Sequence, residues 1–297
     1  MKKFMVWPII TIALIVVTGL QSCKNTDTPG GSEFKFNLEK NKQYDYDLAW
    51  YTDQELMDRN DRINWLTGYT LEVMEEKDKI KTLRVVYNSF RLYMKIMDFE
   101  MDIDSNKPVD SAGIGEDNAM KNAFIKIVGK SFSIKVDEEG NVLSVDGFEE
   151  IIKDIIDAAG VNEDMKLQMR MSLQDQFNEQ ELKDQFAPIF MIFPNKAVKP
   201  GDSWQKNYRK SGKLPADFST TYTVSKIENG QVTLGAKAII TSAGDEMEIK
   251  GEQTGTLLVD SKTGMVVSAE FKQGMDAKTA DFGMKVNATG SVKGKEK

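Results

Sequence analysis

Large apolar residues alternate with polar ones through most of the chain after residue 32. In the segment Tyr44-Asp45-Tyr46-Asp47-Leu48-Ala49-Trp50 the large side chains fall on even positions, with two aspartates between them. Successive side chains of a strand point to opposite faces, so this period of two predicts strands with one buried face and one wet face. The chain is therefore expected to be rich in β-structure.

A longer segment, from Ile80 to Asp104, constrains the shape of the sheet. Val86, Phe90, Leu92, Met94 and Ile96 occupy even positions, and the pattern then switches to odd positions with Met97, Phe99, Met101 and Ile103. Such a change of phase flips the buried face, so a bulge or a break is expected between Ile96 and Met97. A straight strand of this length would run about 80 Å, whereas a globule of this size is about 50 Å across. We therefore expect a strongly curved antiparallel sheet.

Turn and helix signals divide the rest of the body. Asp137–Gly140 predicts a hairpin loop between strands at 131–136 and 141–145, and Asn229-Gly230 predicts one between strands at 218–227 and 231–241. Asp146 is expected to cap a helix that stops at Gly160, and a second helical stretch is expected over about 162–184. The final strands are expected at 247–259, 264–272 and 276–292.

Short matches relate the two β-rich parts. Residues 68–73 resemble 221–226, residues 136–142 resemble 259–266, and residues 41–44 resemble 201–204. An internal duplication and a chance likeness between strands both remain open. The predicted fold is β-rich α+β, with curved antiparallel sheet from two related halves, 33–145 and 194–297, and a helical insertion at 146–193. One domain and two abutting domains are both compatible with this pattern.

The N-terminus is typical of a secretory signal. Lys2 and Lys3 precede an uncharged apolar run from Phe4 to Leu20. A basic start, an apolar stretch and a small residue before the cleavage point describe a signal peptide over residues 1–22, with a transmembrane anchor as the alternative. The sequence Leu20-Gln21-Ser22-Cys23 looks like a bacterial lipobox, although its glutamine is more polar than is usual at that place. Cys23, the only cysteine, would then carry the lipid.

This leader implies a lipid-anchored protein of the bacterial cell envelope. The membrane would be a partner through the acyl chains on Cys23, because several chains anchor a protein stably. Residues 23–32 would form a tether, of which residues 24–32 reach about 30 Å when extended. Lys24, in place of the aspartate of the inner-membrane retention signal, favours the outer membrane. The net charge of −7 at pH 7 disfavours nucleic acid as a partner.

The composition excludes several kinds of catalysis. The chain has no histidine and one cysteine, which excludes Ser-His-Asp and Cys-His catalysis, CxxC zinc sites and internal disulfides. We predict no metal and no cofactor. Sixteen methionines permit a copper(I) interpretation. However, Met165 and Met169 share a helical stripe with Leu173 and Phe177, which favours a core face.

Carboxylates are the remaining candidates for general acids and bases. Asp98, Glu100, Asp102 and Asp104 alternate with apolar residues. Two carboxylates about 5–10 Å apart in a cleft could act as a glycosidase pair, whereas the period of two alone would place all four on the solvated face of a strand. The solvated face is favoured. An envelope polysaccharide hydrolase that uses an Asp/Glu pair remains the alternative function.

Several segments together resemble a family of lipoproteins. They are the lipobox, Phe36–Lys40 with Tyr44–Tyr46, Gly129–Asp137, and Phe193-Pro194 before Val198 and Gly201–Trp204. They are similar to an uncharacterised lipoprotein family of Bacteroidota, a domain of unknown function, over nearly all of the mature chain. This resemblance implies an envelope location and one continuous unit. It implies no activity and no catalytic residue.

A curved sheet covered by apolar helices can open a groove for an acyl chain or a hydrophobic peptide. We therefore expect a non-enzymatic binding or scaffold protein, with a hydrophobic ligand or an envelope protein as its partner. The candidate lining consists of Met165, Met169, Phe177 and Phe186. The same four side chains can equally be plain core.

Overall fold

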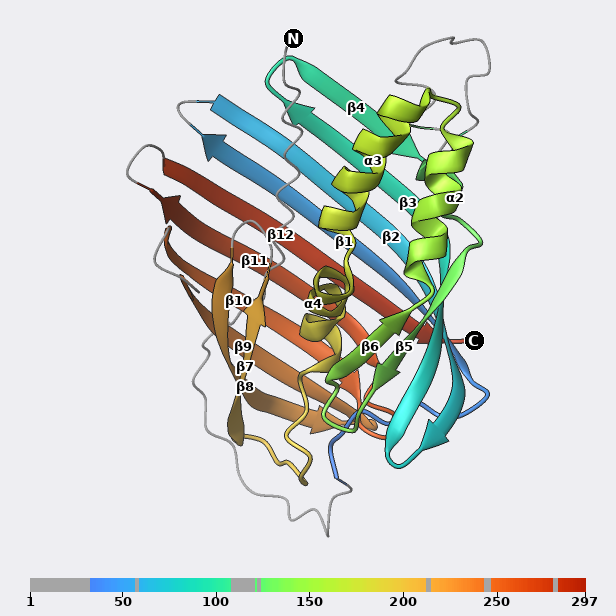
Figure 1. Ribbon diagram of the computed structural model, residues 1–297. Coiled ribbons are helices and arrows are strands. Elements are labelled where there is room, and N and C mark those ends of the chain that lie inside the picture. The colour runs from blue at the N-terminus through green and yellow to red at the C-terminus, as the bar shows by residue number, and fades with distance from the viewer. Residues whose placement is uncertain are drawn as a thin grey trace.

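A computed structural model describes residues 33–297 except 57–58, 108–120, 122–123, 212–214, 243–246 and 280–282. The described elements are strands and helices in the order shown in Figure 1. The strands are β1 (Gln43–Leu56), β2 (Arg59–Lys77), β3 (Ile80–Ile96), β4 (Phe99–Asp104), β5 (Ser131–Val136), β6 (Val142–Asp146), β7 (Ser203–Lys210), β8 (Ala216–Glu228), β9 (Gln231–Ser242), β10 (Glu248–Asp260), β11 (Val266–Lys278) and β12 (Gly283–Glu296). The helices are α2 (Phe148–Ala158), α3 (Glu163–Gln176) and α4 (Glu179–Phe190).

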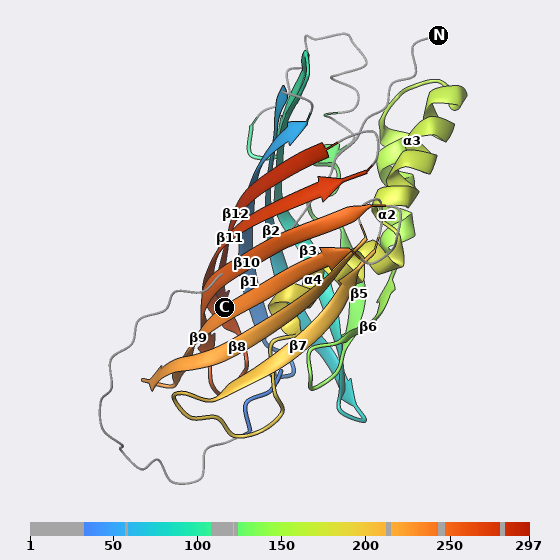
Figure 2. The ribbon, with the colours of Figure 1, turned by 90° about the vertical axis from the view of Figure 1, so that its left-hand side faces the viewer.

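All the strands belong to one antiparallel sheet. Their order is β6-β5-β3-β2-β1-β12-β11-β10-β9-β8-β7, and β4 pairs with β3 beside this path. Figures 1 and 2 show a curved single layer with the helices on one side of it, which we call the inner face. Helix α4 contacts both edge strands, β6 and β7. The predicted fold class is confirmed, as one open curved sheet with the helices inserted between its strands.

The two halves of the chain follow the same path through the sheet. Followed across the sheet in one direction, the first half runs β6-β5-β3-β2-β1 from one edge to the centre. The second half continues in that direction as β11-β10-β9-β8-β7, from the centre to the other edge. Strand β12 lies between them, pairing with β11 on one side and with β1 on the other. Both halves are therefore meanders of one topology, as expected of a duplicated unit.

Equivalent hairpins show this correspondence residue by residue. The β2–β3 and β8–β9 hairpins carry the same bulge, flanked by a Val–Leu pair and by a pair that ends in threonine. The pairs are Val73↔Leu83 and Glu75↔Thr82 in one hairpin, and Val224↔Leu234 and Lys226↔Thr233 in the other. Both close through two-residue turns with positive φ, Asp78-Lys79 and Asn229-Gly230. Val73 is thus equivalent to Val224, so the match of residues 68–73 with 221–226 is wrong by two residues.

The β5–β6 and β10–β11 turns are equivalent as well. In each, an aspartate side chain accepts hydrogen bonds from backbone N–H groups of the turn, and a glycine with positive φ follows. These residues are Asp137 with Gly140, and Asp260 with Gly264. The N-terminal segment 33–38 links the two turns, because the N–H of Phe36 donates to the carbonyl of Glu138 (3.1 Å) and the N–H of Asn37 donates to that of Thr263 (2.9 Å).

Several predicted boundaries need correction. Gly147, with φ of +89°, is the N-cap of α2, and Asp146 ends β6 instead. The stretch predicted at 162–184 is two helices, because the side chain of Asn178 caps α4 by accepting from the N–H of Glu181 (3.0 Å). The strand predicted at 276–292 is divided, with its first residues in β11 and the rest in β12, which extends to Glu296.

The break predicted near Ile96 is confirmed. Met97 has a φ of +54° and the chain reverses there, so that β4 returns along β3. The long apolar segment therefore fits within the molecule by folding back on itself. In the described residues, no helix has both the length and the apolar character needed to cross a bilayer.

Candidate functional site

The apolar side chains of the inner face form two separate clusters. The main core contains residues of both halves, of the helices and of the N-terminal segment. The second cluster, which we call the end cluster, lies where β1, β9 and β11 end and β8, β10 and β12 begin. Its buried members are Ala216, Phe218, Ala238, Ile240, Ile249, Met275, Ala277, Met284 and Val286. No helical residue of the described chain belongs to it.

A row of small and polar side chains crosses the inner face at the border of the end cluster, with which it shares Ala238. Each member pairs with the next across neighbouring strands, and we call them the polar row. They are Lys206, Thr220, Ala238, Gln253, Gln273, Ala288 and Thr52, from β7 through to β1. All but Lys206 are buried. The ammonium of Lys206, at the sheet edge, pairs with Glu139 at 2.9 Å, so the interior part of the row carries no charge.

The equivalent row of the first half is aromatic. There Tyr46 pairs with Tyr69 and Tyr69 with Tyr87, and all three are buried. By the hairpin equivalence, these tyrosines correspond to Lys206, Thr220 and Ala238. In the adjacent row, Val85 and Phe132 correspond to Ala236 and Gly255. The second half therefore presents smaller side chains where the first half fills its interior with rings.

The large side chains of the first half carry the helical layer. Phe132 makes an edge contact with Phe148 of α2 (5.3 Å between ring centres) and a tilted contact with Phe186 of α4 (6.1 Å). Tyr69 also contacts Phe186 (5.9 Å). These contacts explain why the helices lie over the first half, because that is where the sheet offers rings to pack against.

The side chains predicted to line a groove belong to this helical layer. Phe186 is buried among rings of the sheet and α4, while Phe177 is half-buried between Trp65 and Phe148. Met165 and Met169 are half-buried on α3, and only the second packs against the main core. Their role as a ligand lining stays a prediction.

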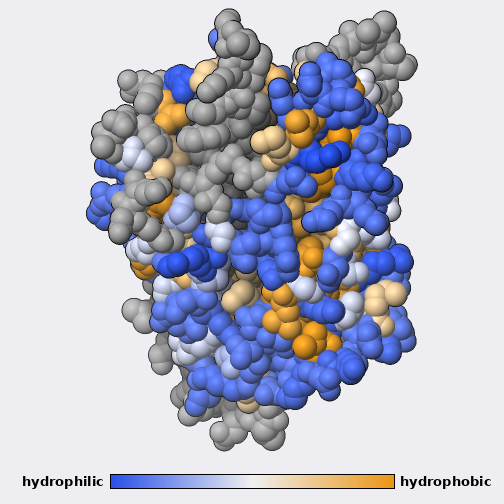
Figure 3. All heavy atoms as spheres, viewed as in Figure 1, coloured by the Kyte–Doolittle hydropathy of each residue, from blue (hydrophilic) through white to orange (hydrophobic). Residues whose placement is uncertain are grey.

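The opposite side of α3 carries exposed apolar side chains. Leu167 is 57% exposed and Met171 is 66% exposed. Figure 3 shows apolar atoms gathered along the helices on a face that is otherwise hydrophilic. This exposure gives the helical layer an apolar outer surface as well as an apolar inner one.

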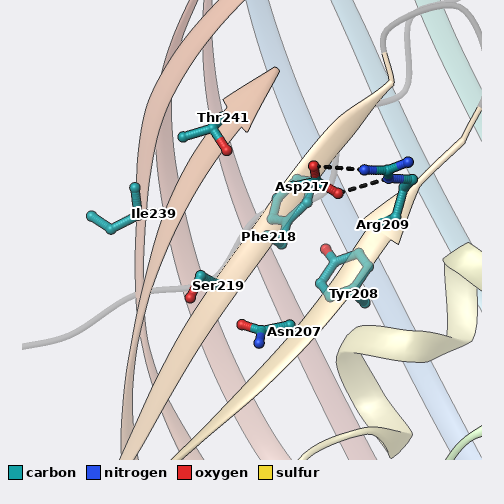
Figure 4. Close-up of a pocket in the computed structure, with 8 residues that line it drawn as sticks. All are labelled: Asn207, Tyr208, Arg209, Asp217, Phe218, Ser219, Ile239 and Thr241. Carbon is teal, nitrogen blue, oxygen red and sulfur yellow. Dashed lines mark hydrogen bonds and ion pairs between the residues drawn. The ribbon is translucent and has the colours of Figure 1, made fainter. Parts of the chain in front are cut away.

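The outer face of the sheet has two shallow hollows. One, of 370 Å³, lies over β7–β9 (Figure 4), and a neighbouring one, of 510 Å³, lies over β9–β12 and shares Ile239 and Thr241 with it. In the first, the guanidinium of Arg209 donates two hydrogen bonds to Asp217, at 2.8 and 3.0 Å. This pairing holds the pKa of the Asp217 carboxyl below its usual value, so the carboxylate is engaged and ionised.

Among the alternating carboxylates at 98–104, Glu100, Asp102 and Asp104 form ion pairs. Arg91 and Lys107 both contact Asp102 and Asp104, from 3.2 to 3.8 Å. Burial raises the pKa of Asp102, but hydrogen bonds from Arg91 and Lys107 outweigh it and hold the pKa below its usual value. A general acid must keep its proton near neutral pH, so Asp102 does not suit the acid role in a glycosidase pair.

One buried carboxylate joins helix to sheet. Asp184 of α4 accepts hydrogen bonds from the N–H of Ser211 (2.7 Å) and from the side chain of Gln180 (2.8 Å). Burial raises the pKa of Asp184, and these two hydrogen bonds act against that rise. Among the described residues, no three carboxylate or thiol side chains come together in a way that could hold a metal ion. Cys23, the predicted lipidation site, lies outside the described residues.

The comparisons with solved structures give distant likenesses. The chain is similar to lipovitellin, in a structure entitled for its lipid–protein interactions (8% identity, 87% of this chain, 25% of that one, TM-score 0.46). It is also similar to the beta domain of the Bordetella autotransporter BrkA (7% identity, 84% and 98% covered, TM-score 0.36). A third likeness is to a protein with a YmcC-like fold from Bacteroides fragilis (10% identity, 86% and 97% covered, TM-score 0.24).

These likenesses are too remote to extend to function. The chain spans about a quarter of the length of lipovitellin. No curated protein matches the sequence. A family model, in contrast, matches residues 78–266, from the β2–β3 turn to the start of β11. This match covers more than half of the chain, which therefore belongs to DUF6263, a family of unknown function.

Proposed function

We propose that this chain is a lipid-anchored, non-enzymatic binding protein of the bacterial cell envelope that holds a hydrophobic ligand against the inner face of its sheet. The observation that carries this proposal is the end cluster, an apolar wall built from strand side chains without a helical residue among the described ones. An apolar surface of this extent is stabilised when another apolar body covers it. In the first half that body is the helical layer. The end-cluster side chains are at most 5% exposed, and the ligand would be one of the bodies that pack against them.

The anchor would put the ligand source within reach. Cys23 lies ten residues before Glu33. The chain after Glu33 is joined to the body by the hydrogen bond from the N–H of Phe34 to the carbonyl of Lys196 (3.0 Å). A tether of this length extends over about 30 Å. The body would therefore stay beside the membrane, by our expectation the outer membrane, where acyl chains are abundant.

Native mass spectrometry with lipid extraction tests the proposal. The sample is residues 24–297, which include every described element, secreted into a bacterial periplasm and purified without detergent. A stoichiometric lipid or peptide adduct is the expected result, and its identity separates a lipid carrier from a peptide binder. A clean mass, together with an envelope protein captured by cross-linking on the lipidated chain, would replace this proposal with a scaffold role.

Paired substitutions locate the ligand. Met275→Gln and Met284→Gln place amides in the end cluster and are expected to remove the adduct. Met171→Gln makes the same chemical change at an exposed position of α3 and is expected to leave the adduct in place. Met169→Ala and Phe177→Ala test the helical lining. A loss of stability without a loss of adduct in these two variants would show that they are core.

A further inference from the structure

Two buried polar atoms beside the polar row have no hydrogen-bond partner in the described chain. They are Nε1 of Trp50 on β1 and Oε1 of Gln273 on β11. Both side chains are only 4% exposed. Nearly all buried donors and acceptors in native proteins are hydrogen-bonded, and leaving one unpaired is destabilising. A third such atom, Oδ1 of Asn195, lies apart from the row, in the turn after α4.

The two residues are both neighbours of Phe271. The indole of Trp50 stacks on Phe271 with 5.5 Å between ring centres and 7° between planes. Gln273 is the next residue of β11 that faces inward after Phe271. The other end of the Gln273 amide donates a weak hydrogen bond to the thioether of Met275, at 4.0 Å. One uncharged donor on β1 and one uncharged acceptor on β11 thus lie on inward-facing residues at the border of the end cluster.

The surrounding positions are small. Ala288 separates Gln273 from Thr52 along the polar row, and Gly255 lies beside Phe271 on the next strand. The equivalent of Gly255 in the first half is Phe132, whose ring fills the interior under the helices. The inner face of the second half therefore carries smaller side chains beside the unpaired amide oxygen of Gln273.

Building on the proposed function, we infer that the ligand is a neutral acyl lipid whose polar group both accepts and donates a hydrogen bond. Its carbonyl would accept from Nε1 of Trp50, and its hydroxyl or amide N–H would donate to Oε1 of Gln273. The acyl chain would lie along Met275, Met284 and Val286 of the end cluster. Monoacylglycerols and N-acyl amides have this chemistry.

The polar row itself disfavours an ionised lipid head. The polar row is uncharged from Thr220 to Thr52, and Lys206 at its far end is engaged by Glu139. Burying a carboxylate without a cation is far costlier than burying a hydroxyl or an amide. A fatty acid with the same chain should therefore bind more weakly than its glycerol ester.

Calorimetric titration of residues 24–297 with 1-monolauroylglycerol and with laurate, both below their micellar concentrations, tests this inference. The unsubstituted chain is expected to bind the glycerol ester at least about tenfold more tightly than laurate. Gln273→Leu and Trp50→Phe each remove one polar atom and keep most of the packing. Each is expected to weaken binding of the ester about five- to tenfold, while Gln205→Leu, the same change on the outer face of β7, leaves it unchanged.

The outcomes separate this inference from the function on which it rests. If the unsubstituted chain binds neither probe and carries no lipid, the proposed function fails. If it binds both probes equally well and the Gln273 and Trp50 variants bind as it does, the protein is a lipid binder without this selectivity, and the inference is overturned. A Gln273→Leu variant that melts higher and binds the ester unchanged would likewise make Gln273 a core residue.

Discussion

The indole ring of Trp50 lies directly over Gly290 on the neighbouring strand, and a Cβ atom at that glycine would overlap the ring. The two residues pair across β1 and β12, the strands that join the two halves of the sheet. Beyond the glycine the ring stacks on Phe271. A residue without a side chain at position 290 therefore lets one indole span the seam.

Substitution of this glycine should loosen the seam. Gly290→Ala is expected to lower the free energy of unfolding by about 1–3 kcal/mol, because the new methyl group displaces the indole. Urea denaturation measures the change. Gly274→Ala, on the outer face of β11, is the control, since its Cβ would find only Oδ1 of Asn287, at 3.8 Å. Equal losses in the two variants would contradict this account of the seam.

The turn glycine Gly264 holds the N-terminal segment by close approach. It has a φ of +71°, and a Cβ there would lie 2.5 Å from the carbonyl oxygen of Lys35 and 2.9 Å from the ring of Phe193. Gly264→Ala is therefore expected to release residues 33–38 and to expose Lys35 to trypsin. Gly230→Ala shares the positive φ, at +75°, but meets nothing within 4 Å. It should cost only about 1–2 kcal/mol of backbone strain and leave cleavage at Lys35 unchanged.

Stability in acid should depend on Glu138. The hydrogen bond from Lys35 (2.6 Å), followed by the one from Lys79, holds the pKa of Glu138 below its usual 4.5. A carboxyl with a lowered pKa in the folded state contributes stability above pH 4.5, and that contribution is lost as the pH falls through the folded value. Glu138→Gln is expected to lose up to about 1 kcal/mol at pH 7.

The pH profile of chemical denaturation checks the sign. The difference between the unsubstituted chain and Glu138→Gln should be largest at neutral pH and should vanish in acid. Glu55→Gln, which removes an exposed carboxylate from β1, controls for the loss of one charge. A difference that grows as the pH falls would be of the wrong sign for this ion pair.

The strands were predictable wherever local chemistry decides them. Alternation identified the inner residues of β1, and Asn229-Gly230 identified the β8–β9 hairpin. Each of these signals is contained within a few consecutive residues. The reversal at Met97 was predicted as a break only, since a phase change does not distinguish a bulge from a turn. The pairing of β1 with β12 joins residues at least 228 positions apart, from Leu56 and Met284 to Tyr44 and Glu296, and no local pattern encodes it.

The candidate site escaped prediction for a physical reason. In the strand Glu248–Thr256, the inward residues Gly251, Gln253 and Gly255 give no apolar signal. Buried glutamine looks like surface glutamine until the neighbouring strands are known. The available signal was the parity of charge, because Glu248, Lys250 and Glu252 all lie on one face. Charge confined to one parity marks the other parity as inner.

Lipidation of Cys23 is the remaining test of the predicted anchor. In a bacterial host fed with labelled palmitate, the full chain should incorporate label and sediment with outer membranes. Cys23→Ser should lose both properties, because the thiol is the acceptor of the lipid, while Ser22→Ala keeps a small residue before the cysteine and should retain them. Lys24→Asp should move part of the protein to inner membranes. Label in the Cys23→Ser variant would contradict this assignment, and an unlabelled but membrane-bound full chain would favour a transmembrane anchor at Phe4–Leu20.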